Sequence, residues 1–256
     1  MQLIDTHCHL QFARLAGRVD EVMAAAEAAD VQRLICVGTT LADSATAAKL
    51  AEAHPNVWAS AGVHPHDVKK PVDVAELERL LKLPKLAAVG EIGLDYYKLY
   101  SPKTDQLKAL RAQIEVGLAS GRPFIFHVRE AFTEFWPIFD DYPNLHGVVH
   151  SFSAGRAELE QILSRGLCVG LNGIVTFSQN AEQLAAAKAV PLDRLLLETD
   201  APFLTPAPFR GQICQPKHVR TVAEFLAELR GEPLEKLAEQ TTANAVKLFG
   251  LETADG

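Results

Sequence analysis

The sequence predicts an α/β protein built as a single (β/α)₈ TIM barrel, and three observations support this prediction. Eight short apolar segments alternate with amphipathic segments along the chain. The links between them are short, which is typical of a parallel sheet. The chain has 256 residues, about the length that one such barrel needs. We therefore expect one domain that spans residues 1–256.

The eight apolar segments are the predicted strands, and most are nearly continuous in apolar residues, as strands buried on both faces require. They span residues 3–7, 33–37, 57–61, 86–91, 123–127, 147–150, 167–171 and 195–199. A doubly wound open sheet is the alternative, and it usually carries a glycine-rich turn after its first strand. Here that turn is His7-Cys8-His9-Leu10, without glycine. The sequence therefore favours closure into a barrel.

Segments with helical periodicity separate the strands, and two more follow the last strand. Examples between the strands span residues 19–29, 42–53, 74–81, 103–119 and 157–164, and the two that follow the last strand span residues 219–229 and 234–249. The longest irregular segment, residues 201–216, is rich in proline. A loop of this length within a compact domain is usually functional.

Charge and cysteine content narrow the class of protein. The net charge of −7 disfavours a basic coat for nucleic acid and a polybasic membrane anchor. It does not exclude a nuclease whose positive charge comes from bound metal. The four cysteines have irregular spacing and form no C-x-x-C pair, which favours reduced thiols in a cytoplasm over disulfides or a cysteine zinc site. We also expect no secretory signal and no membrane span.

Ionisable residues end or follow most of the predicted strands. The carboxyl ends of the strands of a parallel barrel face one rim, where barrel enzymes place their chemistry. His7 and His9 alternate along a strand and so share a face. Glu91 ends an apolar run, where a carboxylate is costly to bury unless it is paired or metal-bound. The residues at this rim are Asp5, His7, His9, His64, His66, Glu91, Asp95, His127, Arg129, Glu130, His150, Glu198 and Asp200.

Four histidines and two carboxylates of this set match a site for one or two divalent metal ions. They are His7, His9, Glu91, His127, His150 and Asp200. Each alone also fits a satisfied core histidine or an ion-paired carboxylate, but convergence at one rim favours a metal site. Imidazole with carboxylate suits zinc, manganese or iron, whereas magnesium prefers oxygen ligands. The sequence does not choose the ion, and we keep Zn, Mg and Mn as candidates.

These motifs resemble the TatD family of metal-dependent deoxyribonucleases, within the amidohydrolase superfamily. The matching segments are residues 5–10, 62–66, 90–97, 127–130, 150–153 and 198–206. The resemblance implies a distorted TIM barrel in which His7, His9 and Asp200 hold one ion. It further implies that His127 and His150 hold a second ion, that Glu91 bridges the two, and that His64 contacts a substrate phosphate. One segment departs from the family, because Cys214-Gln215-Pro216 stands where Asn-Glu-Pro is expected.

We therefore expect a metal-dependent hydrolase that cleaves phosphodiester bonds in DNA, single-stranded or at its ends. Asp200 would position the attacking water and take its proton, with Glu91 as the other catalytic carboxylate; a plain ligand role for Asp200 stays open. His64 and Arg129 would bind the substrate, although His64 could equally be a loop histidine placed by Pro65. Arg129 could clamp a phosphate bidentately, or it could pair with Glu130 or Glu91. No membrane partner is expected, and the oligomeric state is left open.

Two alternative functions remain. The same barrel could hydrolyse a small phosphate ester or an amide, but amidohydrolases of that kind commonly bridge their metals with a carbamylated lysine, where this chain has Glu91. A non-catalytic metal-dependent binding protein is the other alternative. Aromatic residues of the rim loops could stack on exposed bases, although such residues more often serve packing. They are Tyr96, Tyr97, Tyr100, Phe203 and Phe209.

Overall fold

The computed structural model describes residues 1–251. The chain forms two compact units: unit 1 is Met1–Cys36 with Ser151–Gly256, and unit 2 is Val37–His150. The expectation of one domain over residues 1–256 stays a prediction, and its last five residues lie outside the described part. All eight predicted strands are present in the predicted places, each within a few residues of the expected bounds.

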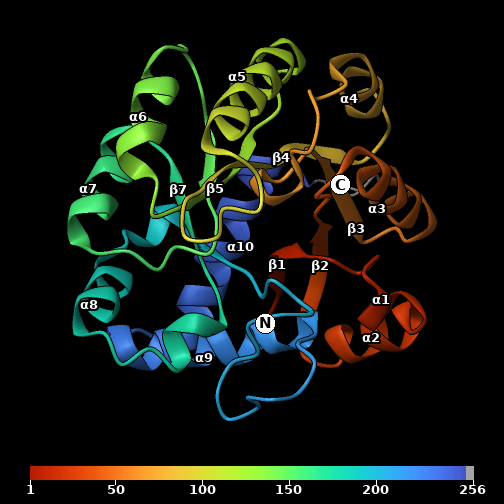
Figure 1. The fold of residues 1–256 in the computed structure, drawn as a ribbon. Helices are drawn as coiled ribbons and strands as arrows, with labels where there is room; N and C mark the ends of the chain where they lie inside the picture. Colours follow the sequence, from red (N-terminus) through yellow and green to blue (C-terminus); the bar gives the residue numbers. More distant parts are fainter. Residues whose placement is uncertain (252–256) are drawn as a thin grey trace. The chain divides into compact units, whose positions relative to one another are not determined.

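Unit 2 contains four parallel strands, each paired with the next along the chain. These are β3 (Val57–Ala61), β4 (Leu86–Asp95), β5 (Phe124–Arg129) and β6 (Gly147–Val149). Its helices are α3 (Leu41–Ala53), α4 (Val74–Leu81), α5 (Lys103–Ser120) and α6 (Phe132–Asp140), and a 3₁₀ turn, η1 (Pro65–Asp67), follows β3. Figure 1 shows α3 to α6 on the outer side of these strands. The arrangement brings the carboxyl ends of four neighbouring strands together.

Strand β4 is longer than the sequence predicts. The apolar run was expected to end at Glu91, but the strand continues to Asp95 because Ile92 and Leu94 are fully buried. Successive side chains of a strand point to opposite faces, so Glu91, Gly93 and Asp95 share the face opposite Ile92 and Leu94. The extension therefore adds a second carboxylate, Asp95, to the face that carries Glu91.

Gly93 allows β4 to approach β5 closely. Its φ is +153°, and a Cβ at this position would lie 1.8 Å from the carbonyl oxygen of His127. We expect Gly93→Ala to lower the free energy of unfolding by about 3 kcal/mol or more, since overpacking and backbone strain add. Gly121→Ala is the matched control, because φ is +66° there but the space is open, so only about 1 kcal/mol should be lost. Urea denaturation measures both, and equal losses would contradict the close approach.

Unit 1 contains the other four strands, in two parallel pairs. β1 (Leu3–Cys8) pairs with β2 (Val31–Cys36), and β7 (Cys168–Leu171) pairs with β8 (Leu195–Leu197). β8 also contacts β1, and the chain after β8 continues beside β1. There, Asp200 N–H donates to the carbonyl of His7 (2.8 Å) and His9 N–H donates to that of Ala201 (2.7 Å). This backbone pairing places Asp200 next to His7 and His9.

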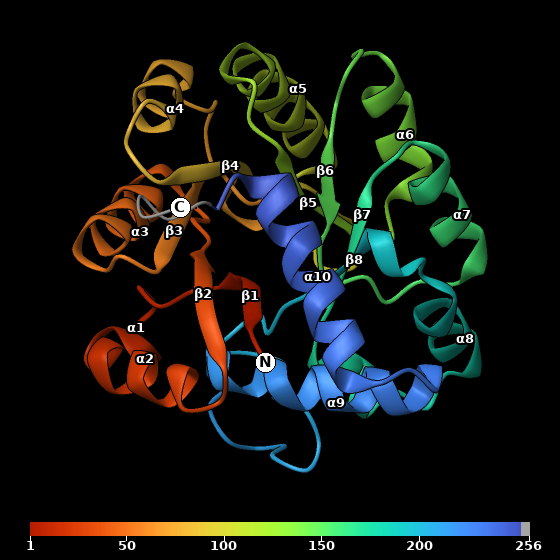
Figure 2. The same ribbon diagram turned by 180° about the vertical axis from the view of Figure 1, so that it is seen from behind.

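Six α-helices lie within residues 1–36 and 151–251 of unit 1, and the last of them packs on its strands. They are α1 (Ala13–Ala16), α2 (Val19–Glu27), α7 (Arg156–Ser164), α8 (Ala181–Ala189), α9 (Val219–Arg230) and α10 (Leu234–Phe249). Helix α10, blue in Figure 2, contacts β1, β8 and α9. Seven of the α-helices in the two units coincide with segments named from the sequence, and α1, α6 and α8 add to them. No helix within residues 1–251 is long and apolar enough to cross a membrane.

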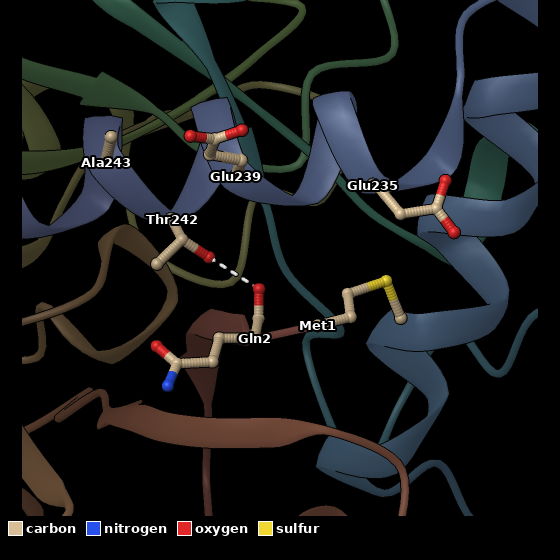
Figure 3. A pocket seen from close by; sticks show the side chains of 6 residues that line it. All are labelled: Met1, Gln2, Glu235, Glu239, Thr242 and Ala243. Atoms are coloured by element: carbon tan, nitrogen blue, oxygen red, sulfur yellow. Dashed lines mark hydrogen bonds between the residues drawn. The ribbon is translucent and has the colours of Figure 1, made fainter.

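A pocket of about 280 Å³ lies between the first residues of the chain and α10. Met1, Gln2, Glu235, Glu239, Thr242 and Ala243 line it (Figure 3). The Thr242 hydroxyl donates to the carbonyl of Gln2 (2.9 Å) and so ties the chain to α10 beside this pocket. None of the residues predicted to carry chemistry lines it, so this pocket is separate from the predicted metal ligands.

Candidate metal centre

Six ionisable side chains gather at the carboxyl ends of the strands of unit 2, and we call them the unit 2 cluster. They are His64 and His66 after β3, Glu91 and Asp95 on β4, His127 on β5 and His150 after β6. His64, Glu91, Asp95 and His150 are buried, whereas the side chains of His66 and His127 are 24% and 15% exposed. The predicted rim of ionisable side chains is therefore present at the carboxyl ends of these four strands.

One oxygen atom of Glu91 is the centre of this cluster. Glu91 Oε1 lies 2.6 Å from His150 Nε2, 2.8 Å from His127 Nδ1 and 3.3 Å from His64 Nε2. The backbone fixes its place, because Glu91 N–H donates to the carbonyl of Gly38 (2.9 Å). A buried carboxylate is retained when it is paired or binds a metal, and here three imidazoles face it.

The tautomer of His64 follows from its second contact. Its Nδ1 accepts the backbone N–H of His66 (3.1 Å), so the proton of the neutral ring is on Nε2, which faces Glu91. Burial lowers the pKa of His64 to about 4 despite the nearby Glu91 charge, and the ring is neutral at pH 7. A ring with Nε2–H offers a hydrogen-bond donor rather than a metal ligand. This favours the predicted substrate contact for His64.

Asp95 orients the ring of His127. Its Oδ2 lies 3.0 Å from His127 Nε2 and 2.9 Å from His66 Nε2, while its Oδ1 accepts the N–H of Lys98 (2.8 Å). Burial alone would raise the pKa of Asp95, but the His127 hydrogen bond and these other partners hold it below the ordinary value. Asp95 is thus a carboxylate, and it holds the Nε2–H of His127. The Nδ1 of His127 is then left to face Glu91.

The converging atoms fit a divalent cation. His127 Nδ1, His150 Nε2 and Glu91 Oε1 all lie within 3.1 Å of at least one other member of the trio. Burial alone would lower the pKa of His127, but its contacts with Asp95 and Glu91 raise this pKa. The surroundings of the His127 ring therefore favour a positive charge. Imidazole nitrogen and carboxylate oxygen are the ligands of zinc and related ions. A carboxylate behind a ligating histidine, as Asp95 is here, is a recurrent feature of such sites.

The contact between Asp95 and His127 gives a testable prediction. We expect Asp95→Asn to weaken divalent-ion affinity by about 10- to 100-fold, the usual effect of losing the partner that orients a ligating histidine. The asparagine keeps the acceptor for Lys98 N–H, so the fold should persist. Isothermal titration of the metal-stripped protein with zinc measures the change. Wild-type affinity in Asp95→Asn would show that Asp95 does not support a ligand.

Unit 1 carries a second group, formed by His7, His9 and Asp200. Asp200 Oδ1 lies 3.3 Å from His9 Nε2 and 3.7 Å from His7 Nε2. The two rings are 5.1 Å apart and nearly perpendicular, and His9 stacks on Phe12 at 4.5 Å. Two imidazoles and a carboxylate so placed also fit one divalent ion. The prediction that His7 and His9 share a face is consistent with their common neighbour, Asp200.

Asp5 connects the two segments that carry His7 and Asp200. Its Oδ1 accepts the N–H of His7 (3.3 Å) and of Thr199 (2.9 Å), and its Oδ2 accepts the Thr199 hydroxyl (2.6 Å). Burial raises the pKa of Asp5 well above its ordinary value, although the Thr199 hydroxyl opposes this. Asp5 therefore joins β1 to the segment after β8 and sets the position of Asp200.

Two further predicted residues have contacts that the sequence did not specify. The Arg129 guanidinium lies over the ring of Tyr97, 3.9 Å from its centroid, instead of pairing with Glu130 or Glu91. Glu198 Oε1 accepts the N–H of Ser151 (2.6 Å), the residue that follows His150, and the side-chain amide of Asn172 (3.3 Å). Glu198 thereby fixes the backbone directly after a predicted ligand.

The sequence places Asp5, His66 and Asp95 at the strand ends but indicates no role for them. The structure makes Asp5 and Asp95 the supports of the two groups. For Asp95 a signal was present, because residues 91, 93 and 95 share one face of a strand. The strand was expected to end at Glu91, so this shared face did not enter the prediction.

Strand–helix alternation with histidine and carboxylate groups at the strand ends defines a metal-dependent hydrolase of the (β/α)₈ class, and comparison with known proteins agrees. The chain belongs to the TatD family: the model described as TatD related DNase matches residues 4–250. The fold class predicted from the sequence is confirmed by a TatD homologue, YJJV from Escherichia coli K12. Its crystal structure has a TM-score of 0.91 and 31% identity over 97% of this chain and 98% of that one.

Two proteins of similar sequence also support the class of metal-dependent hydrolase. An uncharacterized metal-dependent hydrolase, YcfH, from Escherichia coli K12 is 40% identical over 99% of this chain and 98% of its own length. A 3'-5' ssDNA/RNA exonuclease, TatD, from Citrobacter rodentium is 35% identical over 97% of this chain and 98% of its own length. The prediction of a TatD-type metal-dependent hydrolase is therefore confirmed.

Proposed function

We propose that this protein is a nuclease that hydrolyses phosphodiester bonds of single-stranded DNA with the help of one or two divalent ions. The observation that carries the proposal is the convergence of His127 Nδ1, His150 Nε2 and Glu91 Oε1 in unit 2. The similarity to an enzyme named as a 3'-5' ssDNA/RNA exonuclease supports the substrate class.

The proposed ligands form one group in each unit. Glu91, His127 and His150 would hold an ion in unit 2, and His7, His9 and Asp200 would hold an ion in unit 1. Zinc, manganese and magnesium are the candidate ions, and the imidazole content favours the first two. A bound ion would supply Lewis acidity toward a phosphoryl oxygen. The bridging role of Glu91 stays a prediction of the family resemblance.

The remaining roles belong to side chains that can reach a substrate. The Asp200 side chain is 17% exposed, whereas Asp5, the carboxylate that supports the same group, is fully buried, so Asp200 is the one of the two that can accept a proton from the attacking water. His64, neutral and with Nε2–H, donates to a phosphate oxygen. Glu91 is the catalytic carboxylate of unit 2, and the exposed Arg129 contacts a phosphate. One domain over residues 1–256 is kept as part of this proposal.

We also propose a cytoplasmic location. The four cysteines, Cys8, Cys36, Cys168 and Cys214, are buried and form no disulfide with one another. Buried free thiols are typical of proteins that stay in a reducing compartment.

An assay of the metal-stripped protein tests the nuclease proposal. Zinc, manganese or magnesium is added back, and a 5'-labelled single-stranded oligonucleotide is offered beside bis(p-nitrophenyl) phosphate and a dipeptide amide. We expect cleavage of the oligonucleotide that requires the ion. Cleavage of the small ester or the amide alone would replace the proposal with the alternative hydrolase, and no turnover with any ion would overturn it.

A further inference from the structure

The loop between β4 and α5, residues 96–102 in unit 2, exposes large apolar side chains beside the unit 2 cluster. Tyr97 is 54% exposed, Leu99 55% and Tyr100 67%. Scattered single apolar residues on a surface need no explanation, but several together mark an interaction site. Packing, the commoner role of aromatic side chains in such loops, does not account for this exposure.

Cationic side chains accompany the rings of this loop. The Arg129 guanidinium lies 3.9 Å from the centroid of the Tyr97 ring, and Lys98 Nζ lies 6.0 Å from that of Tyr100. Lys103 Nζ lies 3.9 Å from the centroid of the less exposed Tyr96. Rings interleaved with cations provide faces for stacking and charges for phosphates, the combination that proteins use to bind single strands.

The base of the loop is held firmly, so its rings keep a defined position. Lys98 N–H donates to Asp95 Oδ1 (2.8 Å), and the Gln106 amide donates to the carbonyls of Asp95 (3.1 Å) and Ser101 (3.0 Å). The Ser101 hydroxyl donates to the carbonyl of His66 (3.1 Å). A preformed surface loses less conformational entropy when it binds.

The loop also borders the unit 2 cluster directly. The ring of Tyr100 meets that of His66 edge-on at 4.8 Å. His66 in turn lies 2.9 Å from Asp95, the residue that orients His127. A base stacked on Tyr100 would therefore lie a short distance from the atoms proposed to act on the phosphate.

We infer that Tyr97 and Tyr100 form a stacking platform for unpaired bases, with Lys98 and Arg129 contacting the adjoining phosphates. This rests on the proposed function and deepens it, because a platform beside the cluster selects single-stranded nucleic acid over a small phosphate ester. Bases paired in a duplex are stacked on each other and cannot use the platform. Selection comes from the faces of the bases, so it tolerates any sequence.

Binding of uncleaved oligonucleotides tests the platform. The metal-loaded protein is titrated into a fluorescent phosphorothioate octanucleotide and into an abasic strand of the same length, which keeps the phosphates and lacks the bases. We expect Tyr97→Ala and Tyr100→Ala each to weaken binding of the base-bearing strand by about 10-fold or more, as loss of one stacked base does. Binding of the abasic strand should not change. Tyr97→Phe and Tyr100→Phe keep the rings and should bind as the wild type does.

Two controls make the result specific. Tyr142→Ala removes a tyrosine whose hydroxyl is bound to Glu115 outside the platform, and it should bind both strands normally. Lys98→Ala should weaken binding of both strands alike and reduce the salt dependence, since it removes a phosphate contact. Equal affinities of the wild type for the two strands, or wild-type affinity in both alanine variants, would overturn the platform.

The test separates this inference from the proposed function. If the wild type hydrolyses no oligonucleotide, the proposed function fails, while the binding comparison still measures the platform. If the wild type cleaves the oligonucleotide but Tyr97→Ala and Tyr100→Ala bind it normally, only the platform is wrong. If both hold, the ratio of kcat/KM for the oligonucleotide to that for bis(p-nitrophenyl) phosphate should fall in the two alanine variants.

Discussion

Glu91→Gln is expected to reduce cleavage of single-stranded DNA by about 10³-fold or more, because metal catalysis supplies several kcal/mol and 1.4 kcal/mol corresponds to a factor of ten. Glu91 Oε1 is the atom that three imidazoles face, at 2.6, 2.8 and 3.3 Å. Glutamine keeps the shape of the side chain but removes its charge. Steady-state cleavage rates, with the metal content of each variant measured by mass spectrometry, test the prediction.

The matched control for this variant is Glu78→Gln. Glu78 lies on α4, is largely exposed and pairs with Lys82 four residues later. Exposed pairs of this kind contribute little to stability, so this variant should keep the activity and metal content of the wild type. Full activity and full metal content in Glu91→Gln would show that the unit 2 cluster does not hold a catalytic ion.

Asp200→Asn is expected to lower kcat by about 10²- to 10⁴-fold, the usual effect of losing a general base. Asp200 has a φ of +59°, a conformation that asparagine adopts as readily as aspartate, so the backbone should be unchanged. Its N–H would still donate to the carbonyl of His7. The variant therefore removes the carboxylate while leaving the segment in place.

The measurement for Asp200→Asn combines turnover with thermal unfolding. Asp193→Asn, at an exposed position just before β8, is the control and should match the wild type in both. A melting temperature close to that of the wild type, with a large loss of kcat, is the expected result for Asp200→Asn. A turnover within tenfold of the wild type would remove Asp200 from the catalytic residues.

The strands could be predicted because a strand buried on both faces consists of a nearly continuous run of apolar residues. Apolar runs such as 57–61 coincide with β3, and the ends differ by a few residues elsewhere. The end of β4 was predicted too early because Glu91 interrupts an apolar run, although a buried charge can sit inside a strand when it has partners. Strand membership there depends on the fold around Glu91, which the local sequence does not contain.

The residues of the candidate site could be predicted from the sequence, but the contacts among them could not. The ends of the predicted strands indicated His127 and Glu91 as site residues. The role of Asp95, however, depends on which ring nitrogen of His127 faces which carboxylate. Likewise, the stacking of Arg129 on Tyr97 requires the loop after β4 and the end of β5 to be neighbours. Contacts of this kind arise from tertiary structure, so a single sequence cannot specify them.

The segment that departs from the family pattern has a structural role. Cys214 is fully buried, and Gln215 N–H donates to His218 Nδ1 (3.0 Å) at the start of the 3₁₀ turn η4 (Pro216–His218), which leads into α9. Burial lowers the pKa of His218 to about 4, so this ring is a neutral acceptor at pH 7. Cys214-Gln215-Pro216 thus forms the entry to α9.

The central claim is that the unit 2 cluster holds a divalent ion on which hydrolysis depends. Anomalous scattering from crystals of the active, metal-restored protein, recorded at the absorption edge of the restoring ion, tests it most directly. We predict an anomalous peak enclosed by Glu91, His127 and His150, with Asp95 behind His127. A peak found only away from these three side chains, in crystals of protein that retains full activity, would contradict the claim.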